Sequence, residues 1–368
     1  MEDQYYMKFA IDLAKRATGQ TSPNPVVGCV IVKEGEIVGF GAHLRAGEAH
    51  AEVNAIQMAG SRYKVRGSTV YVTLEPCSHF GKTPPCSDLL IQSQVSKVVI
   101  ASTDPNPLVA GKGIEKLREA GIIVELGVCE EDALALNQVF FHYIKTGKPF
   151  VTLKTAASLD GKTATHTNES KWITGPDARM DVHQYRHQHD GILVGVGTVL
   201  SDDPSLDTRL PNGGKNPIRI VLDTYFRTPL NAKVMTDGKA PTWIVTGNKP
   251  NLEKVKALEG KEDIKVLALP SEKVEINDLL TLLGEAGITS LLVEGGATVN
   301  ASFLKEKAIQ QVITYFAPKL IGGQDAPSLI GGEGFATMEE VVELEIKEVT
   351  KIGSDLKIVS ILKEDPRR

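Results

Sequence analysis

The sequence predicts a protein of the α/β class that is divided into two domains. Its 368 residues exceed what one ordinary hydrophobic core organises, and this length favours about two domains. Apolar strand segments alternate with helical segments through both halves, a pattern typical of a layered fold with a partly parallel sheet. The cluster Thr146-Gly147-Lys148-Pro149 interrupts this alternation after a long helical segment. We therefore expect one domain over residues 1–146 and a second over 147–368.

The first domain is expected to begin with an amphipathic helix, because Tyr6, Phe9, Ala10, Leu13 and Ala17 recur at helical spacing. Apolar runs bounded by turn residues then predict strands over 26–32, 37–41, 69–74, 97–101 and 122–126. Helical segments are expected over 50–59, from about residue 86, over 113–120 and over 132–145.

The second domain is expected to begin with a strand over 150–156. Short apolar strands follow over 192–196, 218–222, 242–245, 265–268 and 291–293, with helical stretches between several of them. A late group of strands covers 311–316, 345–349 and 357–362, and the last two of these are candidates for a hairpin. The second half is therefore also predicted to be a layered α/β domain.

Composition excludes several classes of protein. The net charge of −5 supplies no bulk attraction to nucleic acid or anionic membranes. The first residues carry acidic side chains where a secretory signal has a basic region and an apolar core. No apolar run reaches the roughly 18 residues that span a bilayer. Four cysteines in so long a chain do not suggest a disulfide framework. We expect a cytoplasmic protein.

A candidate zinc site is formed by His50, Cys77 and Cys86. One imidazole and two thiolates are good zinc ligands, and three protein ligands leave a fourth position for water. Zinc lowers the pKa of that water enough to supply hydroxide near neutral pH. Glu52 lies two residues after His50, and it is therefore a candidate to move protons between this water and a leaving amine.

Other interpretations of these residues remain open. The His50-x-Glu52 pair is also compatible with a surface pair on a helix, and the two cysteines with two buried core residues. A purely structural zinc is a separate alternative, which requires four protein ligands. Neither remaining cysteine lies in the motif. Cys29 falls in an apolar strand and Cys129 beside the end of a strand, and we interpret both as residues in or near the core.

The order of these residues resembles the signature of the cytidine deaminase superfamily, H-x-E followed by P-C-x-x-C. Here eight residues separate the two cysteines instead of two, which disfavours a nucleoside or tRNA deaminase. The longer insert is similar to that of the bifunctional riboflavin-biosynthesis deaminase/reductases, and so are several further motifs. These are Pro23-Asn24-Pro25-x-Val27-Gly28, Gly41-Ala42-His43, Glu75-Pro76-Cys77-Ser78-His79-x-Gly81-x-Thr83-Pro84-Pro85-Cys86 and Asp104-Pro105-Asn106-Pro107 followed by Gly111-x-Gly113.

This resemblance implies a cytidine-deaminase-like α/β/α domain that holds one Zn²⁺ ion. It also implies a set of substrate contacts. They are Asn24, His43, His79, Lys82, Thr83 and Asn106. A ribose phosphate requires a cation such as Lys82, and the amides of Asn24 and Asn106 offer donors and acceptors that suit the edge of a pyrimidine. The alternative is that an Asn beside a Pro merely sets a turn.

In the second domain, residue chemistry alone is less specific. The strand at 291–293 ends in Glu294-Gly295-Gly296 and opens a helix, and the strand at 192–194 is followed by Gly195-Val196-Gly197-Thr198. Free backbone N–H groups at a helix start bind anions, and glycine permits close approach of a pyrophosphate. Neither segment has the G-x-G-x-x-G pattern, so no Rossmann fingerprint is present. A tight turn between strand and helix is the simpler alternative for each segment.

The second half also resembles the reductase domain of the same family, which has a dihydrofolate-reductase-like fold and uses NADPH. The resemblance rests on Lys154-x-Ala156-x-Ser158-Leu159-Asp160-Gly161, Ser170-x-Trp172-Ile173, Arg186, Gly195-x-Gly197-Thr198-Val199-x-x-Asp202-Asp203-Pro204-x-Leu206-x-x-Arg209 and Glu294-Gly295-Gly296. It implies cofactor contacts at Ala156, Trp172, Thr198, Asp202, Thr224, Gly296, Ala297, Thr298, Val299, Asn300, Ala301 and Ser302. It implies substrate contacts at Ser170, Arg186, Leu206, Arg209 and Glu294.

The two arginines suit a sugar phosphate, because a planar guanidinium grips it with two hydrogen bonds; ordinary surface ion pairs are the alternative. Reduction at a sugar carbon also needs an acid, and Lys154 and Glu294 are the candidate catalytic groups, with their roles left open. The family implies deamination of 2,5-diamino-6-(ribosylamino)-4(3H)-pyrimidinone 5′-phosphate, followed by reduction of the ribosyl group to ribityl.

Two further hypotheses are weighed. A nucleoside or nucleic-acid deaminase with an appended ligand-binding domain predicts a basic surface, which the net charge does not favour. A zinc-stabilised binding module predicts a closed four-ligand site and no release of ammonia. We expect a small-molecule enzyme that forms a homo-oligomer and binds neither nucleic acid nor membrane.

Overall fold

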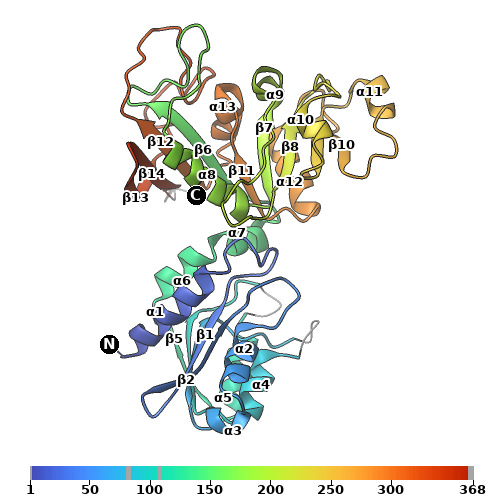
Figure 1. Cartoon of the computed structure of the whole chain (residues 1–368). Helices are drawn as coiled ribbons and strands as arrows, with labels where there is room; N and C mark the ends of the chain where they lie inside the picture. Colours follow the sequence, from blue (N-terminus) through green and yellow to red (C-terminus); the bar gives the residue numbers. More distant parts are fainter. Residues whose placement is uncertain (1, 80–83, 107–109, 364–368) are drawn as a thin grey trace. The chain divides into compact units, whose positions relative to one another are not determined.

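The computed structural model describes residues 2–79, 84–106 and 110–363. Two compact units divide the chain, Met1–Gly147 and Lys148–Arg368. Both consist of alternating strands and helices, as the sequence predicts, and each is described by itself (Figure 1). Within the described residues, no helix combines the length and the apolar character that a membrane crossing requires.

The first unit is built on a sheet of five strands in the order β2-β1-β3-β4-β5. β3, β4 and β5 run parallel, whereas β1 is antiparallel to both of its neighbours. The strands are β1 (Gly28–Lys33), β2 (Glu36–Ala42), β3 (Thr69–Leu74), β4 (Lys97–Ser102) and β5 (Ile123–Leu126). The helices are α1 (Glu2–Lys15), α2 (Ala51–Met58), α3 (Arg62–Val65), α4 (Cys86–Gln92), α5 (Lys112–Glu119), α6 (Glu130–Leu136) and α7 (Gln138–Thr146).

Helices cover both faces of this first sheet. Alternate residues of a strand point to opposite sides, so each strand contributes side chains to both helical layers. Val30 and Val99 pack against α1 and α6, whereas Ile31, Val72 and Ile100 pack against α2, α4 and α5. The domain therefore has the three-layer α/β/α arrangement that was expected.

One prediction for this unit is wrong: the segment 132–145 is not a single helix. It divides into α6 and α7 at Asn137. The Asn137 side chain is buried and binds the backbone of Val26, accepting from its N–H and donating to its carbonyl oxygen, both at 2.9 Å. An Asn side chain that bonds backbone groups competes with helical hydrogen bonding, and this accounts for the break.

The second unit contains a nine-stranded sheet in the order β10-β9-β8-β7-β11-β6-β12-β14-β13. All pairs from β10 to β12 are parallel; β14 is antiparallel to both β12 and β13. The strands are β6 (Phe150–Ser158), β7 (Gly191–Gly195), β8 (Ile218–Leu222), β9 (Thr242–Thr246), β10 (Ile264–Ala268), β11 (Ser290–Val293), β12 (Gln311–Ala317), β13 (Leu344–Ile352) and β14 (Asp355–Leu362). The helices are α8 (Pro176–Gln188), α9 (Val196–Asp202), α10 (Lys233–Thr236), α11 (Leu252–Lys256), α12 (Ile276–Glu285) and α13 (Ala297–Lys305).

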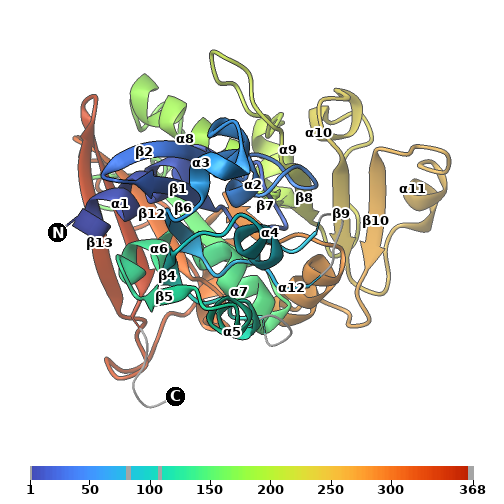
Figure 2. The same ribbon diagram turned by 90° about the horizontal axis from the view of Figure 1, so that it is seen from below.

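The expected hairpin is confirmed, since β13 and β14 pair in antiparallel register from Leu344 opposite Leu362 to Ile352 opposite Asp355. At the other edge of the sheet, β10 lies beside β9 (Figure 2).

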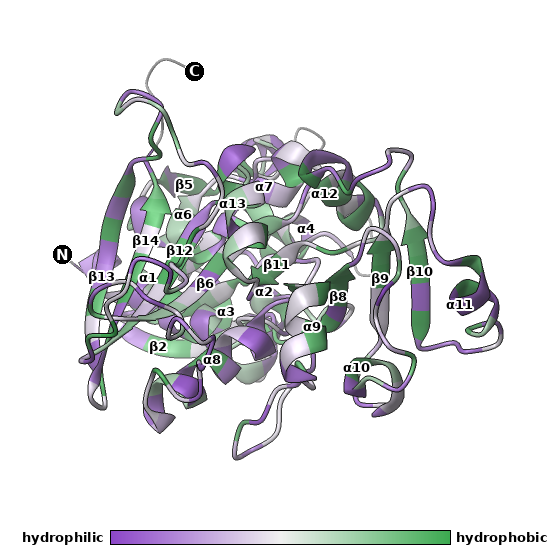
Figure 3. Ribbon diagram, turned by 90° about the horizontal axis from the view of Figure 1, so that it is seen from above, coloured by the Kyte–Doolittle hydropathy of each residue, from purple (hydrophilic) through white to green (hydrophobic). Residues whose placement is uncertain are grey.

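Buried parallel strands are mostly apolar, and much of β8 accordingly appears in the green of hydrophobic residues (Figure 3). One face packs against α12 and α13, and the other against α9 and α10.

Candidate functional site

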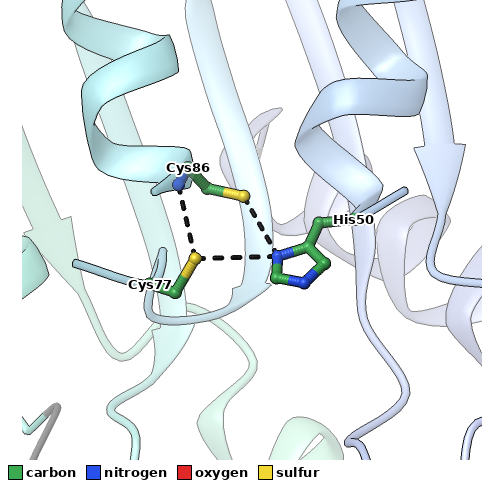
Figure 4. Close-up of side chains that lie close together, drawn as sticks. All are labelled: His50, Cys77 and Cys86. Atoms are coloured by element: carbon green, nitrogen blue, oxygen red, sulfur yellow. Dashed lines mark hydrogen bonds between the residues drawn. The ribbon is translucent and has the colours of Figure 1, made fainter. Parts of the chain in front are cut away.

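The three expected metal ligands come together in the first unit (Figure 4). His50 caps the start of α2, Cys86 is the first residue of α4, and Cys77 lies in the loop after β3. The Nδ1 atom of His50 lies 3.2 Å from the sulfur of Cys86 and 3.6 Å from that of Cys77. Among the described residues, this is the one cluster of three or more His, Cys, Asp or Glu side chains with metal-binding spacing.

These donors fit a zinc ion. Ligand atoms about 2.0–2.3 Å from a tetrahedral zinc lie roughly 3.5 Å from one another. The observed separations are of that size, and the atom of His50 that faces both sulfurs is Nδ1. Cys29 lies in the buried core, and Cys129 precedes α6 at its N-cap. The part of the chain that the structure describes thus supports a three-ligand site rather than a closed four-ligand site.

The two thiols differ in acidity. A hydrogen bond from Cys86, together with one from the His50 ring, lowers the pKa of Cys77 to about 4 despite its burial. The same hydrogen bond, together with burial, raises the pKa of Cys86. The hydrogen bond to Cys77 also raises the pKa of His50. Without a cation the three groups therefore share protons, which metal binding displaces.

Glu52 lies beside this cluster, in the first turn of α2, and is only 3% exposed. Its carboxyl group hydrogen-bonds with Cys86. Burial, with the negative charge of Cys77 as the next cause, raises the pKa of Glu52 to about 7. A carboxyl group with a pKa near neutrality can both accept and release a proton under ordinary conditions.

Asn24 and His43 form a pair next to the metal ligands. The Nδ1 atom of His43 lies 3.1 Å from the carbonyl oxygen of Ala49, so this nitrogen carries the proton. Burial lowers the pKa of His43 and keeps the ring neutral. Its Nε2 atom therefore accepts a hydrogen bond from the Asn24 amide nitrogen at 3.2 Å. The rings of His43 and His50 lie edge to face, 5.4 Å between centroids.

The remaining expected contacts of the first unit lie on two loops. His79 is exposed and interacts electrostatically with Asp104. Asn106 follows Asp104, whose carboxylate accepts a hydrogen bond from the Asn106 N–H at 2.9 Å. Lys82 and Thr83 lie outside the described residues.

In the second unit, the expected residues lie near the carboxyl ends of neighbouring parallel strands. Thr198 follows β7, Thr224 follows β8, and Glu294 follows β11. Ligands of open α/β sheets bind at this edge, where loops leave the strands.

A largely buried cluster of charges is formed by Lys154, Arg186 and Glu294, whose side chains are 16%, 13% and 11% exposed. The guanidinium of Arg186 donates two hydrogen bonds to the Glu294 carboxylate, at 2.7 and 3.0 Å, and a third to the carbonyl oxygen of Asp207. The Nζ atom of Lys154 lies 3.8 Å from the same carboxylate. Arg186 is thus held in a bidentate ion pair, whereas Lys154 makes a looser contact.

The charges of this cluster shift the pKa values of Glu294 and Lys154. Burial by itself would raise the pKa of Glu294, but the charges of Arg186 and Lys154 outweigh it and lower the pKa to about 2. Burial, aided by the charge of Arg186, lowers the pKa of Lys154, although Glu294 opposes this shift. Glu294 is therefore an anion at neutral pH, and the pKa of Lys154 is lowered from its ordinary value.

Sequence analysis missed residues that line this cluster. His183 is buried and interacts electrostatically with Arg186, Arg209 and Glu294. It precedes Arg186 by three residues on α8, so helical spacing places both side chains on one face, and this was the available signal. The ring of Tyr315 lies 5.9 Å from the Lys154 nitrogen, but no sequence pattern indicated this contact.

The start of α13 packs closely against two glycine loops. A Cβ atom on Gly195 or Gly295 would lie within 2.8 Å of side-chain atoms of Val299. Val299 therefore serves packing as well as lying in the expected cofactor segment 296–302. Asn300 is 3% exposed and donates to the carbonyl oxygen of Leu329 at 2.8 Å.

The other expected contacts vary in exposure. Trp172 is 64% exposed, and the guanidinium of Arg179 stacks over its ring at 4.4 Å. Leu206 is buried in a hydrophobic cluster, so a ligand could reach only its backbone. Arg209 is exposed and pairs with Asp207 at 3.3 Å. Ser170 and Asp202 are exposed; Ala156, Thr198 and Thr224 are half-buried.

Comparisons with known proteins identify a family for each of the two domains. The family described as "RibD C-terminal domain" matches residues 149–358. The family described as "Cytidine and deoxycytidylate deaminase zinc-binding region" matches residues 1–102. The sites and domains together define a class: a two-domain enzyme that joins a zinc-binding deaminase domain to a reductase domain with a dihydrofolate-reductase-like fold.

Full-length relatives narrow this class to one family. The chain is 54% identical to Riboflavin biosynthesis protein RibD of Bacillus amyloliquefaciens, covering 98% of this chain and 97% of the relative. It is 43% identical to the RibD protein of Escherichia coli (strain K12), covering 97% and 98%.

Solved structures give the same result. RibD of Acinetobacter baumannii matches with a TM-score of 0.88 at 41% identity, covering 99% of each chain. A deaminase/reductase from Thermotoga maritima matches with a TM-score of 0.86 at 36% identity, covering 98% of this chain and 99% of that one. The chain belongs to the RibD family.

Proposed function

We propose that the chain catalyses two consecutive reactions of riboflavin biosynthesis. The first removes the 2-amino group of 2,5-diamino-6-(ribosylamino)-4(3H)-pyrimidinone 5′-phosphate as ammonia. The second reduces the ribosyl group to ribityl and yields 5-amino-6-(ribitylamino)uracil 5′-phosphate. The observation that carries this proposal is the presence of both buried constellations in one chain, His50-Cys77-Cys86 with Glu52, and Lys154-Arg186-Glu294.

In the first reaction, His50, Cys77 and Cys86 would hold zinc. When bound, zinc acidifies water and so supplies a nucleophile near neutral pH. Glu52 takes the proton from the attacking water and delivers it to the leaving amine. Its burial beside Cys86 supports this role, because the carboxyl group is within reach of the metal site and has a pKa of about 7.

The pyrimidine is recognised by polar side chains around the zinc site. His43 orients the Asn24 amide by accepting from its nitrogen, and this leaves the Asn24 carbonyl oxygen available to accept from an N–H group of the ring. We assign Asn106 and His79, which lie on two further loops, to the same role on the basis of family resemblance. We assign Lys82 and Thr83 to the ribose phosphate on the basis of family resemblance.

In the second reaction, NADPH would, when bound, be the source of the hydride that reduces the sugar carbon C1′. Lys154 acts as the acid at the ring oxygen, and Glu294 remains ionised and orients the substrate. The geometry supports this division, because the bidentate Arg186 contact fixes the Glu294 charge and burial lowers the pKa of Lys154. Arg186 acts by holding Glu294 in place.

The remaining reductase contacts are proposed from the family pattern. The cofactor contacts are Ala156, Trp172, Thr198, Asp202, Thr224 and Gly296, Ala297, Thr298, Val299, Asn300, Ala301 and Ser302. Ser170, Leu206 and Arg209 contact the substrate, and the exposed guanidinium of Arg209 suits its phosphate.

One experiment tests both reactions. Purified zinc-loaded protein is given the diaminopyrimidine substrate, and ammonia release and NADPH oxidation are followed separately. We expect ammonia without NADPH and NADPH oxidation only once deaminated product has formed. Absence of ammonia release from protein with stoichiometric zinc would refute the first assignment. Failure to oxidise NADPH with the deaminated intermediate supplied would refute the second.

We further propose that the protein is a cytoplasmic homo-oligomer that binds no nucleic acid. The edge strand β13 supports oligomer formation, since Ile346 and Val349 are 60% and 57% exposed on it. Apolar side chains that are exposed on an edge strand favour association through that edge. Light scattering should give a mass above that of one 39.7 kDa chain, and Ile346→Lys should lower it. A monomer at working concentration would contradict this proposal.

A further inference from the structure

Glu75 is a buried carboxylate that the reaction scheme does not use. It follows β3 directly and is 4% exposed. Its Oε2 atom accepts hydrogen bonds from the backbone N–H groups of Asp104 at 3.3 Å and Gly111 at 3.1 Å. Its Oε1 atom accepts from Gly113 at 3.0 Å and Ile114 at 3.4 Å. One side chain therefore holds four backbone donors.

These four donors lie on both sides of Asn106. Asp104 precedes it by two residues, and Gly111 follows it by five. Asn106 itself is tied to both ends, because its N–H donates to the Asp104 carboxylate at 2.9 Å and its carbonyl oxygen accepts from Ala110 at 2.8 Å. The position of the Asn106 backbone is thus set, through one intermediate residue on each side, by Glu75.

The same residue is also close to the metal ligands. Glu75 precedes Cys77 by two residues, and its own N–H donates to the Ser102 carbonyl oxygen at 3.0 Å. The start of α5 packs tightly against this turn, since a Cβ atom on Gly113 would lie 2.1 Å from the Pro76 carbonyl oxygen. The loop that carries Cys77 and the segment that carries Asn106 therefore share one support.

We infer that Glu75 is a positioning residue that fixes Asn106 relative to the metal ligands and so sets the affinity for the pyrimidine. This inference rests on the proposed function, in which Asn106 contacts the ring. A carboxylate can accept at both oxygens, whereas a carboxamide of the same shape accepts at only one. In Glu75→Gln, the amide nitrogen would face backbone N–H groups and lose two of the four contacts.

The role is more than that of a helix cap. The bonds from Gly113 and Ile114 belong to the first turn of α5 and that from Gly111 to its N-cap, but the bond from Asp104 lies outside the helix, on the far side of Asn106. A simple cap would change stability alone. A positioning role also predicts that the effect on substrate binding passes through the Asn106 side chain.

The test is a double-mutant cycle on ammonia release, with Glu75→Gln, Asn106→Ala and the double variant. Glu75→Gln should keep stoichiometric zinc and raise KM about tenfold or more, with a smaller effect on kcat. In the Asn106→Ala background, the same substitution should change KM by less than about twofold. Glu115→Gln is the matched control, because Glu115 is an exposed carboxylate on α5, and it should behave as the unmodified protein.

Three outcomes separate the possibilities. If Asn106→Ala leaves KM unchanged, the proposed contact of Asn106 fails, and the role of Glu75 fails with it. If Asn106→Ala raises KM but Glu75→Gln does not, the inference alone is overturned. Equal effects of Glu75→Gln in both backgrounds would also overturn it, because the effect would then bypass Asn106.

A second variant guards against misfolding of Glu75→Gln. Asp104→Ala removes the acceptor of the Asn106 N–H and leaves the buried Glu75 carboxylate in place. It should raise KM severalfold in a manner that depends on the Asn106 side chain. If Glu75→Gln does not fold and Asp104→Ala has an unchanged KM, the inference is refuted.

Discussion

The two domains each bury a carboxylate at the proposed reaction centre, yet they treat its charge in opposite ways. Glu52 lies beside the metal ligands, and burial, followed by the negative charge of Cys77, raises its pKa to about 7. Glu294 is buried as well, but the neighbouring Arg186 and Lys154 lower its pKa to about 2. Burial raises the pKa of both acids, and only in the second domain do neighbouring cations outweigh it.

This difference shows where the positive charge at each site comes from. The first domain provides anionic and neutral donors with the spacing of a metal site, so the positive charge must come from a bound ion. The second domain supplies its cations from its own chain, through a bidentate guanidinium and an amine. Glu52 is therefore suited to move protons, and Glu294 to remain a fixed anion.

The largest effect is expected from removing a metal ligand. Cys77→Ala should lose stoichiometric zinc and all measurable ammonia release, because two ligands remain where three are needed. NADPH oxidation with the deaminated intermediate should continue. Metal analysis and both assays check this, on protein shown to be folded, because zinc loss can destabilise a domain. Cys129→Ala is the matched control and should keep its zinc. Full zinc in both Cys77→Ala and Cys86→Ala would refute the ligand set.

The next largest effect tests the proton-transfer role of Glu52. Glu52→Gln should retain zinc and slow ammonia release by at least about a hundredfold, the scale of general acid–base catalysis. The substitution preserves the shape of the side chain and removes the carboxyl group that can take up and release a proton. Near-normal ammonia release from the zinc-loaded variant would show that Glu52 does not transfer the proton. The proposed difference in role between Glu52 and Glu294 would then fail.

A comparable loss of activity in the second domain tests whether the two sites are independent. Lys154→Ala should slow NADPH oxidation by about a hundredfold or more and leave ammonia release nearly unchanged, because Lys154 has no role in deamination. Lys261→Ala, which removes an exposed lysine of the same domain, should affect neither reaction. Equal loss of both activities in folded Lys154→Ala protein would require a shared site or obligatory coupling.

The smallest effect is a shift in pH dependence. The negative charge of Glu294 raises the pKa of Lys154 above the value that burial alone would give. Neutral Gln at position 294 removes this attraction, so Lys154 would lose its proton at a lower pH. The alkaline limb of the residual reductase rate should therefore move to lower pH in Glu294→Gln.

The opposite shift is expected when a positive charge is removed. The charge of Arg186 lowers the pKa of Lys154, and Arg186→Met should move the alkaline limb to higher pH. Rate–pH profiles of both variants against the unmodified protein provide the measurement. A limb that stays in place in both variants would mean that Lys154 is not the titrating acid.

Local sequence patterns were sufficient for the strands and for choosing the three side chains that the structure brings together as a candidate metal site. An apolar run bounded by turn residues placed the strand at Thr69–Leu74 with the same bounds that the structure shows. Where a tertiary contact overrode local propensity, the prediction was wrong. The buried Asn137 side chain binds Val26, 111 residues away, and divides one expected helix into two.

The sequence by itself determined which residue types could bind a metal and which motifs belong to the family, because ligand chemistry is a property of each side chain. Only the tertiary structure decided which nitrogen of His50 faces the sulfurs, that Arg186 clamps Glu294, and that Glu75 supports the Asn106 segment. Arg186 and Glu294 are 108 residues apart in the chain and 2.7 Å apart in space. Electrostatic energy depends on distance and burial, and folding alone sets both.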